Sequence, residues 1–348
     1  MVKRARIALA TAVATALSAA LGAALLPTAA MAVPCTPTGF FRDGIDMTAA
    51  QIGGDVNNVT LDATGCNIGV YYNGSIPGNV TGANIFGANY FGVVVNGDVG
   101  AVSVNVTGST IHDIGETPLT GQGDQHGNAI YYRALASGTA SGIISGNTVM
   151  NYQKGGIIAN GSVSVTIENN VVTGQGPVSW IAQNGIQLGY GAKATVTGNT
   201  SSANAYTGAG LVSSAGILVV GGPCFGVGLP YTVGLDITRN TVTNNDVGVW
   251  LFNADAAPAC NAPTTKTNNT VKFNFISNGA VTNTTGDSAT CGYQAGIADV
   301  GHKDQLVNNQ ISGFGYTPTV GADCTGPNPA FLRFVDADPS ARAVSSNK

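Results

Sequence analysis

The sequence carries very little charge for its length. Asp, Glu, Lys and Arg together make up 9% of its 348 residues, whereas ordinary soluble proteins contain about 25%. The first 32 positions hold three of the 14 Lys and Arg residues, which leaves 11 basic against 18 acidic residues in the remainder. Nucleic acids and anionic membrane surfaces bind proteins with clustered positive charge. We therefore expect neither of them as a partner.

Helical periodicity and long apolar segments are also missing after the first 32 residues. No later segment repeats apolar side chains every 3.6 residues, so we expect few helices. At the N-terminus, a basic start precedes an Ala/Leu-rich run, and Ala30-Met31-Ala32 has the small-x-small pattern of a cleavage site. This site and Pro27 favour a signal peptide over a membrane anchor. We predict a signal peptide over residues 1–32 and a secreted, extracellular protein.

Glycine, by contrast, is abundant, and two short elements alternate along the chain. One is Gly or Ala followed by a β-branched residue at the start of a strand. The other is a turn, usually containing Asn, before the next strand. The first element occurs at Gly92-Val93, Ala129-Ile130, Gly156-Ile157, Gly185-Ile186, Gly216-Ile217, Gly248-Val249 and Gly296-Ile297. The second occurs at Ala83-Asn84, Gly146-Asn147, Asn169-Asn170, Gly198-Asn199, Arg239-Asn240, Phe273-Asn274 and Asn308-Asn309, with Ser109 in the same place.

An irregular repeat of more than about 20 residues fits a right-handed parallel β-helix better than a propeller or a sandwich. Stacked Asn side chains hydrogen-bond along such a coil, and Asn tolerates the left-handed backbone of its corners. An antiparallel sandwich gives no reason for an Asn ladder. We predict an all-β, single-stranded right-handed parallel β-helix with an Asn ladder and few helices. It forms one monomeric domain over 33–348, with an N-terminal cap over 33–56 and a C-terminal tail over 327–348.

These repeated elements, from about Asn57 to Gly326, resemble the pectin-lyase-like superfamily, and particularly its exported bacterial right-handed β-helix repeat proteins. The resemblance implies a three-sheet coil with a long groove, which in many relatives holds an acidic polysaccharide. It implies little about the reaction, because such folds host many functions. An extracellular polysaccharide is thus the expected partner.

Six cysteines follow the predicted signal peptide, and an even number in an exported protein favours disulfides. Six cysteines allow fifteen pairings. The simplest joins sequence neighbours, since residues about one coil turn apart lie within disulfide reach. A metal site would require a C-x-x-C motif or a nearby His pair, and the sequence has neither. The expected bridges are Cys35–Cys66, Cys224–Cys260 and Cys291–Cys324.

Aligning the repeats on the Gly or Ala of the first element places polar and aromatic residues in two outward rows, by strand alternation. The row two residues before this position contains Lys154, Gln183 and Asp246. The row two residues after it contains Tyr131, Gln187 and Trp250. Arg133 lies on the same face, and Asp124 and His126 lie at the entrance of its strand.

This set suits a polymer that contains uronic acid. Arg133 and Lys154 neutralise a uronate carboxylate, which acidifies the neighbouring C5 proton. His126 or a tyrosine, Tyr131 or Tyr132, acts as acid or base in β-elimination or epimerisation. The predicted catalytic residues are His126, Tyr131, Arg133 and Lys154. The predicted substrate-binding residues are Asp124, Gln183, Gln187, Asp246 and Trp250, and the rings of Trp250 and Tyr131 are expected to stack on sugars.

The motifs of known subfamilies are incomplete. Asp124-Gln125-His126-Gly127 matches only the Asp and His of the Asp-Pro-His-Glu motif of alginate epimerases with this fold. No pair of clustered aspartates accompanies Gly301-His302-Lys303, so hydrolysis by two carboxylates is disfavoured. We expect no cofactor, and the scattered aspartates form no evident calcium cluster. Two functions stay open. One is a carbohydrate-active protein that binds or processes an extracellular polysaccharide, by lyase or epimerase chemistry if it is catalytic. The other is a non-catalytic surface, adhesion or structural module in which these side chains face water or a partner.

Overall fold

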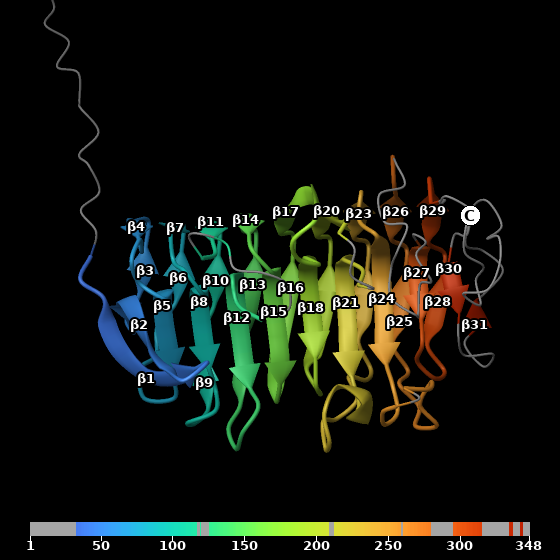
Figure 1. The fold of residues 1–348 in the computed structure, drawn as a ribbon, viewed down its shortest axis with the longest axis horizontal. Helices are drawn as coiled ribbons and strands as arrows, with labels where there is room; N and C mark the ends of the chain where they lie inside the picture. The colour runs from blue at the N-terminus through green and yellow to red at the C-terminus, as the bar shows by residue number, and fades with distance from the viewer. Residues whose placement is uncertain are drawn as a thin grey trace, which may run out of the picture. The chain divides into compact units, whose positions relative to one another are not determined.

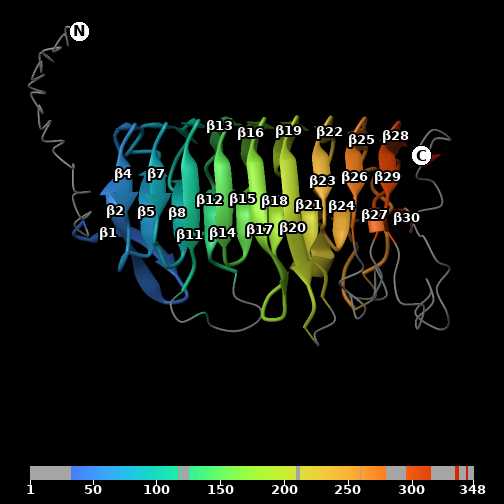
Figure 2. The same ribbon diagram turned by 90° about the horizontal axis from the view of Figure 1, so that it is seen from above.

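Three parallel sheets, called A, B and C, wind into a coil of stacked turns (Figure 1). The structure is a computed structural model. It describes residues 33–116, 119, 125–208, 212–258, 260–279 and 295–314, together with the backbone of 334–336 and 342–343. All of the described residues belong to one compact unit. Apart from the pairs β1–β2 and β9–β10, successive strands of the chain enter different sheets. Each sheet pairs equivalent strands of successive turns, which Figure 2 shows from above. The predicted parallel β-helix is confirmed.

The strands of each sheet follow one another along the coil. Sheet A contains β1 (Thr36–Arg42), β2 (Ile45–Ile52), β5 (Ile68–Asn73), β8 (Phe91–Asn96), β12 (Asn128–Ala134), β15 (Gly155–Gly161), β18 (Asn184–Gly189), β21 (Ala215–Gly221), β24 (Val247–Asn253), β27 (Ala295–Asp299) and β30 (Phe334–Asp336). Sheet B contains β3 (Val56–Asn57), β6 (Val80–Thr81), β9 (Val102–Ser103), β10 (Val106–Thr107), β13 (Ala140–Ser145), β16 (Val163–Glu168), β19 (Lys193–Thr197), β22 (Asp236–Thr238), β25 (Thr270–Lys272), β28 (Gln305–Val307) and β31 (Arg342–Ala343). Sheet C contains β4 (Thr60–Asp62), β7 (Asn84–Phe86), β11 (Thr110–Ile114), β14 (Thr148–Tyr152), β17 (Val171–Val178), β20 (Thr200–Tyr206), β23 (Thr241–Thr243), β26 (Phe275–Ser277) and β29 (Gln310–Ser312).

Helix is scarce, as the sequence predicts. Within the described ranges the helical element is the 3-10 turn η1 (Pro223–Phe225). In that same part of the chain, no helix has the length and apolarity needed to cross a membrane.

The apolar residue after each Gly or Ala packs inside the coil, as predicted. Ile130 pairs with Ile157, which pairs in turn with Ile186, and all three are fully buried. Neighbouring strands of a sheet lie about 4.8 Å apart, so these branched side chains stack turn upon turn. Gly92 shows why the preceding position is small, because a Cβ there would lie 2.5 Å from the carbonyl oxygen of Ala129.

A ladder of amides runs along the corner between sheets B and C, as predicted. The backbone N–H and Nδ2 of Asn170 donate to Oδ1 of Asn199 at 3.0 and 2.9 Å. Asn199 donates in the same way to Asn240, at 2.9 and 3.0 Å. The buried rungs are Ser109, Asn147, Asn170, Asn199, Asn240, Asn274 and Asn309.

Two details of the predicted ladder are wrong. The left-handed backbone belongs to the residue before a rung, such as Arg239 with φ of 56° before Asn240, and not to the rung itself. The rung's own side chain is then free to reach its neighbour along the coil. Asn84 is not a rung either, because its neighbour Ala83 occupies that position and donates its backbone N–H to Oγ of Ser109.

The N-terminal hairpin lies across the outer face of sheet A. Strands β1 and β2 pair antiparallel, and in Figure 1 the hairpin (blue) crosses β5 towards β8. The ring of Phe40 packs against Tyr71 and Phe91, with centroids 6.1 and 6.3 Å apart. Tyr131 and Ile158 belong to the same buried cluster. The first half of this face is therefore covered, contrary to the exposed face that the sequence predicted.

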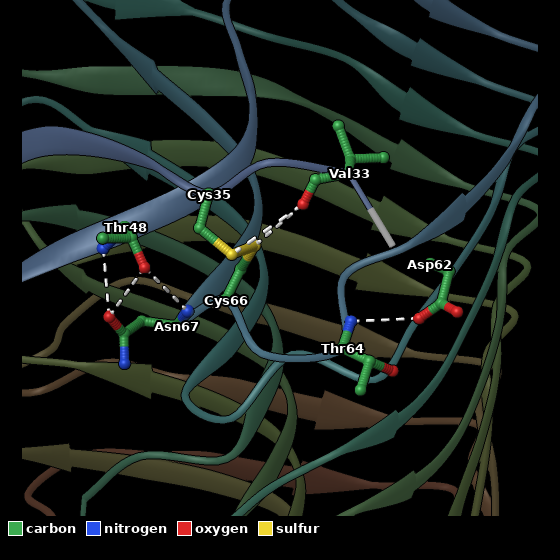
Figure 3. Close-up of a disulfide and its surroundings, with 7 residues drawn as sticks. All are labelled: Val33, Cys35, Thr48, Asp62, Thr64, Cys66 and Asn67. Atoms are coloured by element: carbon green, nitrogen blue, oxygen red, sulfur yellow. Dashed lines mark hydrogen bonds between the residues drawn. A yellow bond between two sulfur atoms is a disulfide. The ribbon is translucent and has the colours of Figure 1, made fainter. Parts of the chain in front are cut away.

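Two of the three predicted disulfides are present. Cys35 and Cys66 join the start of β1 to the turn before β5, with Cα atoms 5.3 Å apart (Figure 3). Beside this bridge, Thr48 and Asn67 hydrogen-bond to each other across β2 and the same turn. Cys224 and Cys260 have Cα atoms 5.2 Å apart. Cys291 and Cys324 lie outside the described residues, so their bridge stays a prediction.

We expect Asn199→Ala to lower the free energy of unfolding by about 1–3 kcal/mol, because it leaves buried donors of Asn170 without an acceptor. Denaturant unfolding of the full chain measures this change. Thr200→Ala, at a half-buried outward position of the next strand, is the matched control. An equal effect of both substitutions would contradict a stabilising role of the ladder.

Candidate functional site

A cavity of about 180 Å³ opens on the outer face of sheet A, beside the tip of the N-terminal hairpin. Strands β12, β15 and β18 form its floor, and residues before β12 and β15 contribute its rim. Its lining contains two cationic side chains and no carboxylate. The lining residues are Arg42, Gln125, Asn128, Tyr131, Leu135, Lys154, Ile158, Asn160, Gln187 and Tyr190.

The floor confirms one of the two predicted rows. Tyr131 pairs with Ile158, and Ile158 pairs with Gln187, so these three outward side chains lie side by side. Gln187 accepts from Nδ2 of Asn184 at 3.2 Å and donates to Oδ1 of Asn160 at 3.3 Å. These bonds fix the amide of Gln187 at the pocket floor.

Lys154 is the ionisable group of the pocket with the most altered acidity. Its Nζ donates to the carbonyl oxygen of Ala182 at 2.6 Å. Burial lowers the pKa of Lys154 to about 8, because the charged amine loses water there. A lysine of this kind is partly neutral near neutral pH and can accept a proton.

Arg42 is a pocket residue that the sequence analysis missed. It comes from the end of β1, and its Nη2 donates to the carbonyl oxygen of Gln125 at 3.0 Å. The signal was present in Asp43-Gly44, the type of two-residue turn that joins antiparallel strands. That turn reverses the chain into β2 and leaves Arg42 at the tip of the hairpin. Arg42 lies before the first repeat, so aligning the repeats could not place it at the pocket.

Asn128 places an unpaired acceptor at the same pocket. The side chain is 5% exposed, and its Oδ1 has no hydrogen-bond partner. Its Nδ2 donates weakly to the carbonyl oxygen of Gln125, at 3.5 Å. A buried acceptor without a donor is unfavourable. The Oδ1 atom itself has almost no exposed surface.

The predicted tyrosines have different environments. Tyr131 lines the pocket and stacks one face on Phe91, with centroids 5.2 Å apart. Tyr190 also lines the pocket, and burial raises its pKa. Tyr132 points into the core, where its hydroxyl donates to the carbonyl oxygen of Val104 at 2.7 Å and burial raises its pKa. Tyr132 therefore lies away from the site.

Arg133 is not available to a substrate in the way the sequence predicted. Its Nη2 lies 2.5 Å from Oδ2 of Asp98, and its guanidinium stacks 4.8 Å from the ring centroid of Phe40. It does not line the pocket. The physical reason is the hairpin, which covers this end of the row and places the ring of Phe40 against the guanidinium of Arg133.

His126 likewise does not line the pocket. It is 5% exposed and lies between Asp43 and Glu116, with its ring stacked on Tyr90. The side chain of His126 is therefore not placed to act as a base on a substrate in the cavity, as the sequence predicted.

The remaining predicted binding residues do not form an exposed row. Gln183 is fully buried and donates to the carbonyl oxygen of Tyr152 at 2.6 Å. Asp246 is also fully buried, and its Oδ2 accepts from the backbone N–H of Tyr206 and Ser214. Both point into the corner because backbone donors and acceptors there need partners. Asp124 lies outside the described residues.

Trp250 faces outward, as predicted, but it is 4% exposed and stacked on Phe252, with centroids 4.8 Å apart. It belongs to a second apolar cluster, formed by β21, β24 and β27, and β21 lies between its strand and the pocket-lining β18. The pocket thus unites Lys154, Tyr131 and Gln187 of the predicted set and adds Arg42, Asn128 and Tyr190. In the described ranges, no group of three or more His, Cys, Asp or Glu residues could hold a metal ion.

Comparison with known proteins identifies the family. The family model of the right handed beta helix region matches residues 43–222 and 133–311. The chain belongs to this family. The match supports the predicted right hand of the coil.

Two solved structures of the catalytic domain of a GH87 alpha-1,3-glucanase, both variants in complex with nigerose, are similar in fold. They share 12% and 11% identity with this chain, at TM-scores of 0.26 and 0.27. Each alignment covers 86% of this chain and 63% of the glucanase chain. At these values the likeness carries no further conclusion about this chain. No curated protein matches the sequence.

We expect the lowered pKa of Lys154 to appear in its reactivity. In the folded chain, the rate of acylation of Lys154 by an amine-directed reagent levels off above about pH 8. In the denatured chain, the same lysine continues to gain reactivity towards about pH 10, the ordinary range of lysine. Peptide mapping by mass spectrometry follows both. Identical pH profiles in the two states would contradict the lowered pKa.

Proposed function

We propose that this protein is exported and binds an acidic polysaccharide, with one uronate unit in the pocket on sheet A. The observation behind this is the lining, which has two cations, the amide of Gln187, two tyrosines and no carboxylate. The two disulfides among the described residues suit an oxidising extracellular compartment. Drug-sized ligands occupy pockets of roughly 300–1,000 Å³. The smaller cavity suits a single unit, with the chain continuing over the surface.

The polar groups of the pocket match the groups of a uronate. Arg42 and Lys154 present donors to a carboxylate, and a guanidinium can bind both carboxylate oxygens. The amide of Gln187 and the hydroxyls of Tyr131 and Tyr190 can pair with sugar hydroxyls. A fully ionised sulfate or phosphate has no hydroxyl to offer them. A sugar acid offers the anion and the hydroxyl together.

Lys154 supports chemistry at the carbon next to the carboxylate. In β-elimination, its neutral amine takes the C5 proton, the C5–H electrons form the C4–C5 double bond, and the C4–O bond breaks. The departing oxygen takes a proton from a tyrosine hydroxyl or water. In epimerisation, a proton returns to the opposite face of C5 instead. Arg42 neutralises the carboxylate and so stabilises the charge that develops on it.

Tyr131 and Tyr190 are the proton donors at hand. Burial raises the pKa of Tyr190, which keeps its hydroxyl protonated at neutral pH. A non-catalytic surface module, the competing function, would also bind the polysaccharide but would form no product from it. Turnover therefore separates the two.

We expect Lys154→Gln to lower the rate of forming unsaturated product, or of C5 proton exchange, at least about 100-fold on a responsive uronate polymer. Wild-type activity rises with pH and levels off above about 8, as the amine becomes neutral. Polygalacturonate and alginate are the probes, with a neutral glucan as control. Lys193→Gln, an exposed lysine on sheet B, is the matched variant and keeps wild-type activity.

We expect Arg42→Gln to weaken uronate binding about 10-fold or more, because hydrogen bonds to charged groups contribute about 1.5–3 kcal/mol. Calorimetry with oligogalacturonates measures the affinity. Binding without turnover by the wild type supports the non-catalytic module. Absence of binding to every acidic polymer would sink the proposed function.

A further inference from the structure

His126 occupies a clasp between the N-terminal hairpin and the coil. Its Nδ1 lies 3.7 Å from Oδ2 of Asp43 at the hairpin turn, and its Nε2 lies 3.1 Å from Oε2 of Glu116, which follows β11. The imidazole stacks on Tyr90, with centroids 4.0 Å apart. A nearly buried imidazole with a carboxylate at each nitrogen is placed for an ionic contact and poorly placed to receive a substrate proton.

The same hairpin turn forms a wall of the pocket. Arg42 lines the cavity and immediately precedes Asp43. Its Nε lies 3.5 Å from Oδ1 of Asp43, and its Nη2 donates to the carbonyl oxygen of Gln125, the residue before His126. Holding Asp43 against His126 therefore also fixes Arg42 over the pocket.

We propose that His126 is a positioning residue: while protonated, it holds the hairpin tip, and with it Arg42, over the pocket. The inference rests on the proposed function, because it concerns the same site. An imidazolium has an N–H at both nitrogens, whereas a neutral imidazole has one. Loss of the proton therefore removes the charge from both contacts, leaves one nitrogen as a lone pair facing a carboxylate, and loosens the tip.

The direction of the pH dependence follows from the groups that face His126. Asp43 and Glu116 favour its charge, Tyr90 is neutral, and Arg42 opposes the charge but is itself paired with Asp43. Histidine ordinarily changes charge between about pH 5 and 8. Ordinary carboxyl groups become neutral only near about pH 4. The comparison therefore runs from mildly acidic to neutral solution, where the two carboxylates keep their charge.

Hydrogen exchange of the hairpin tests this without any ligand. In the full chain, we expect protection of the peptide spanning Arg42–Ile45, relative to His126→Gln at the same pH, to fall about three-fold between pH 5.5 and 7.5, a size typical of a partly exposed ion pair. Comparison at equal pH cancels the intrinsic exchange rates. His112→Gln removes another histidine–aspartate contact, His112 Nδ1 to Asp113 at 2.6 Å on sheet C, and keeps the wild-type profile. A constant ratio between wild type and His126→Gln would overturn the proposal.

Affinity for a galacturonate trimer gives the second readout. Between pH 5.5 and 7.5, we expect wild-type binding to weaken about three-fold and binding by His126→Gln and Asp43→Asn to stay constant. Equal slopes in wild type and both variants would overturn the positioning role. A wild type that binds no uronate, yet shows the pH-dependent exchange, would sink the proposed function and leave the clasp established.

Discussion

The register in which each turn hydrogen-bonds to the next is the constraint on which this structure depends. A slip of one residue would send every inward side chain outward. Backbone hydrogen bonds alone would form almost as well after such a slip. The amide ladder is not, because Asn170, Asn199 and Asn240 bond only when equivalent residues lie in line. The ladder therefore fixes, at one corner, the alignment that the three sheets then follow.

That constraint decides where function can lie. The inward positions and the corner rungs are occupied by stacking, as Ile130, Ile157 and Ile186 show. The outward side chains need not match from one turn to the next. One outward row changes from Tyr131 to Ile158 to Gln187 over three turns. Chemistry in such a coil is therefore local to a few turns. Here it gathers where the hairpin adds a wall to β12, β15 and β18.

The sequence predicted what repetition encodes. The alignment of Tyr131 with Gln187 and the ladder rungs followed from comparing one turn with the next. What it could not supply was contact between segments that do not repeat. The hairpin brings Arg42 to the pocket, and its Phe40, together with Asp98 after β8, holds Arg133 away from it. Neither effect is visible in a comparison of turns, because Arg42 has no equivalent in any other turn.

The position of Lys154 has a structural role in the other turns and a proposed chemical role in this one. The residues aligned with Lys154 are Gln183, Ser214 and Asp246, and each serves the corner: Ser214 Oγ accepts from the N–H of Gln183, and Asp246 accepts from the N–H of Ser214. A lysine has three donors and no acceptor, so it cannot take part in this column. Its amine instead reaches the carbonyl oxygen of Ala182 at the edge of the cavity. There it is desolvated without a carboxylate in the lining to stabilise its charge, which is why its pKa falls to about 8. The reactivity proposed for Lys154 thus arises because lysine, which has no acceptor, stands at a position where the aligned residues of other turns accept hydrogen bonds.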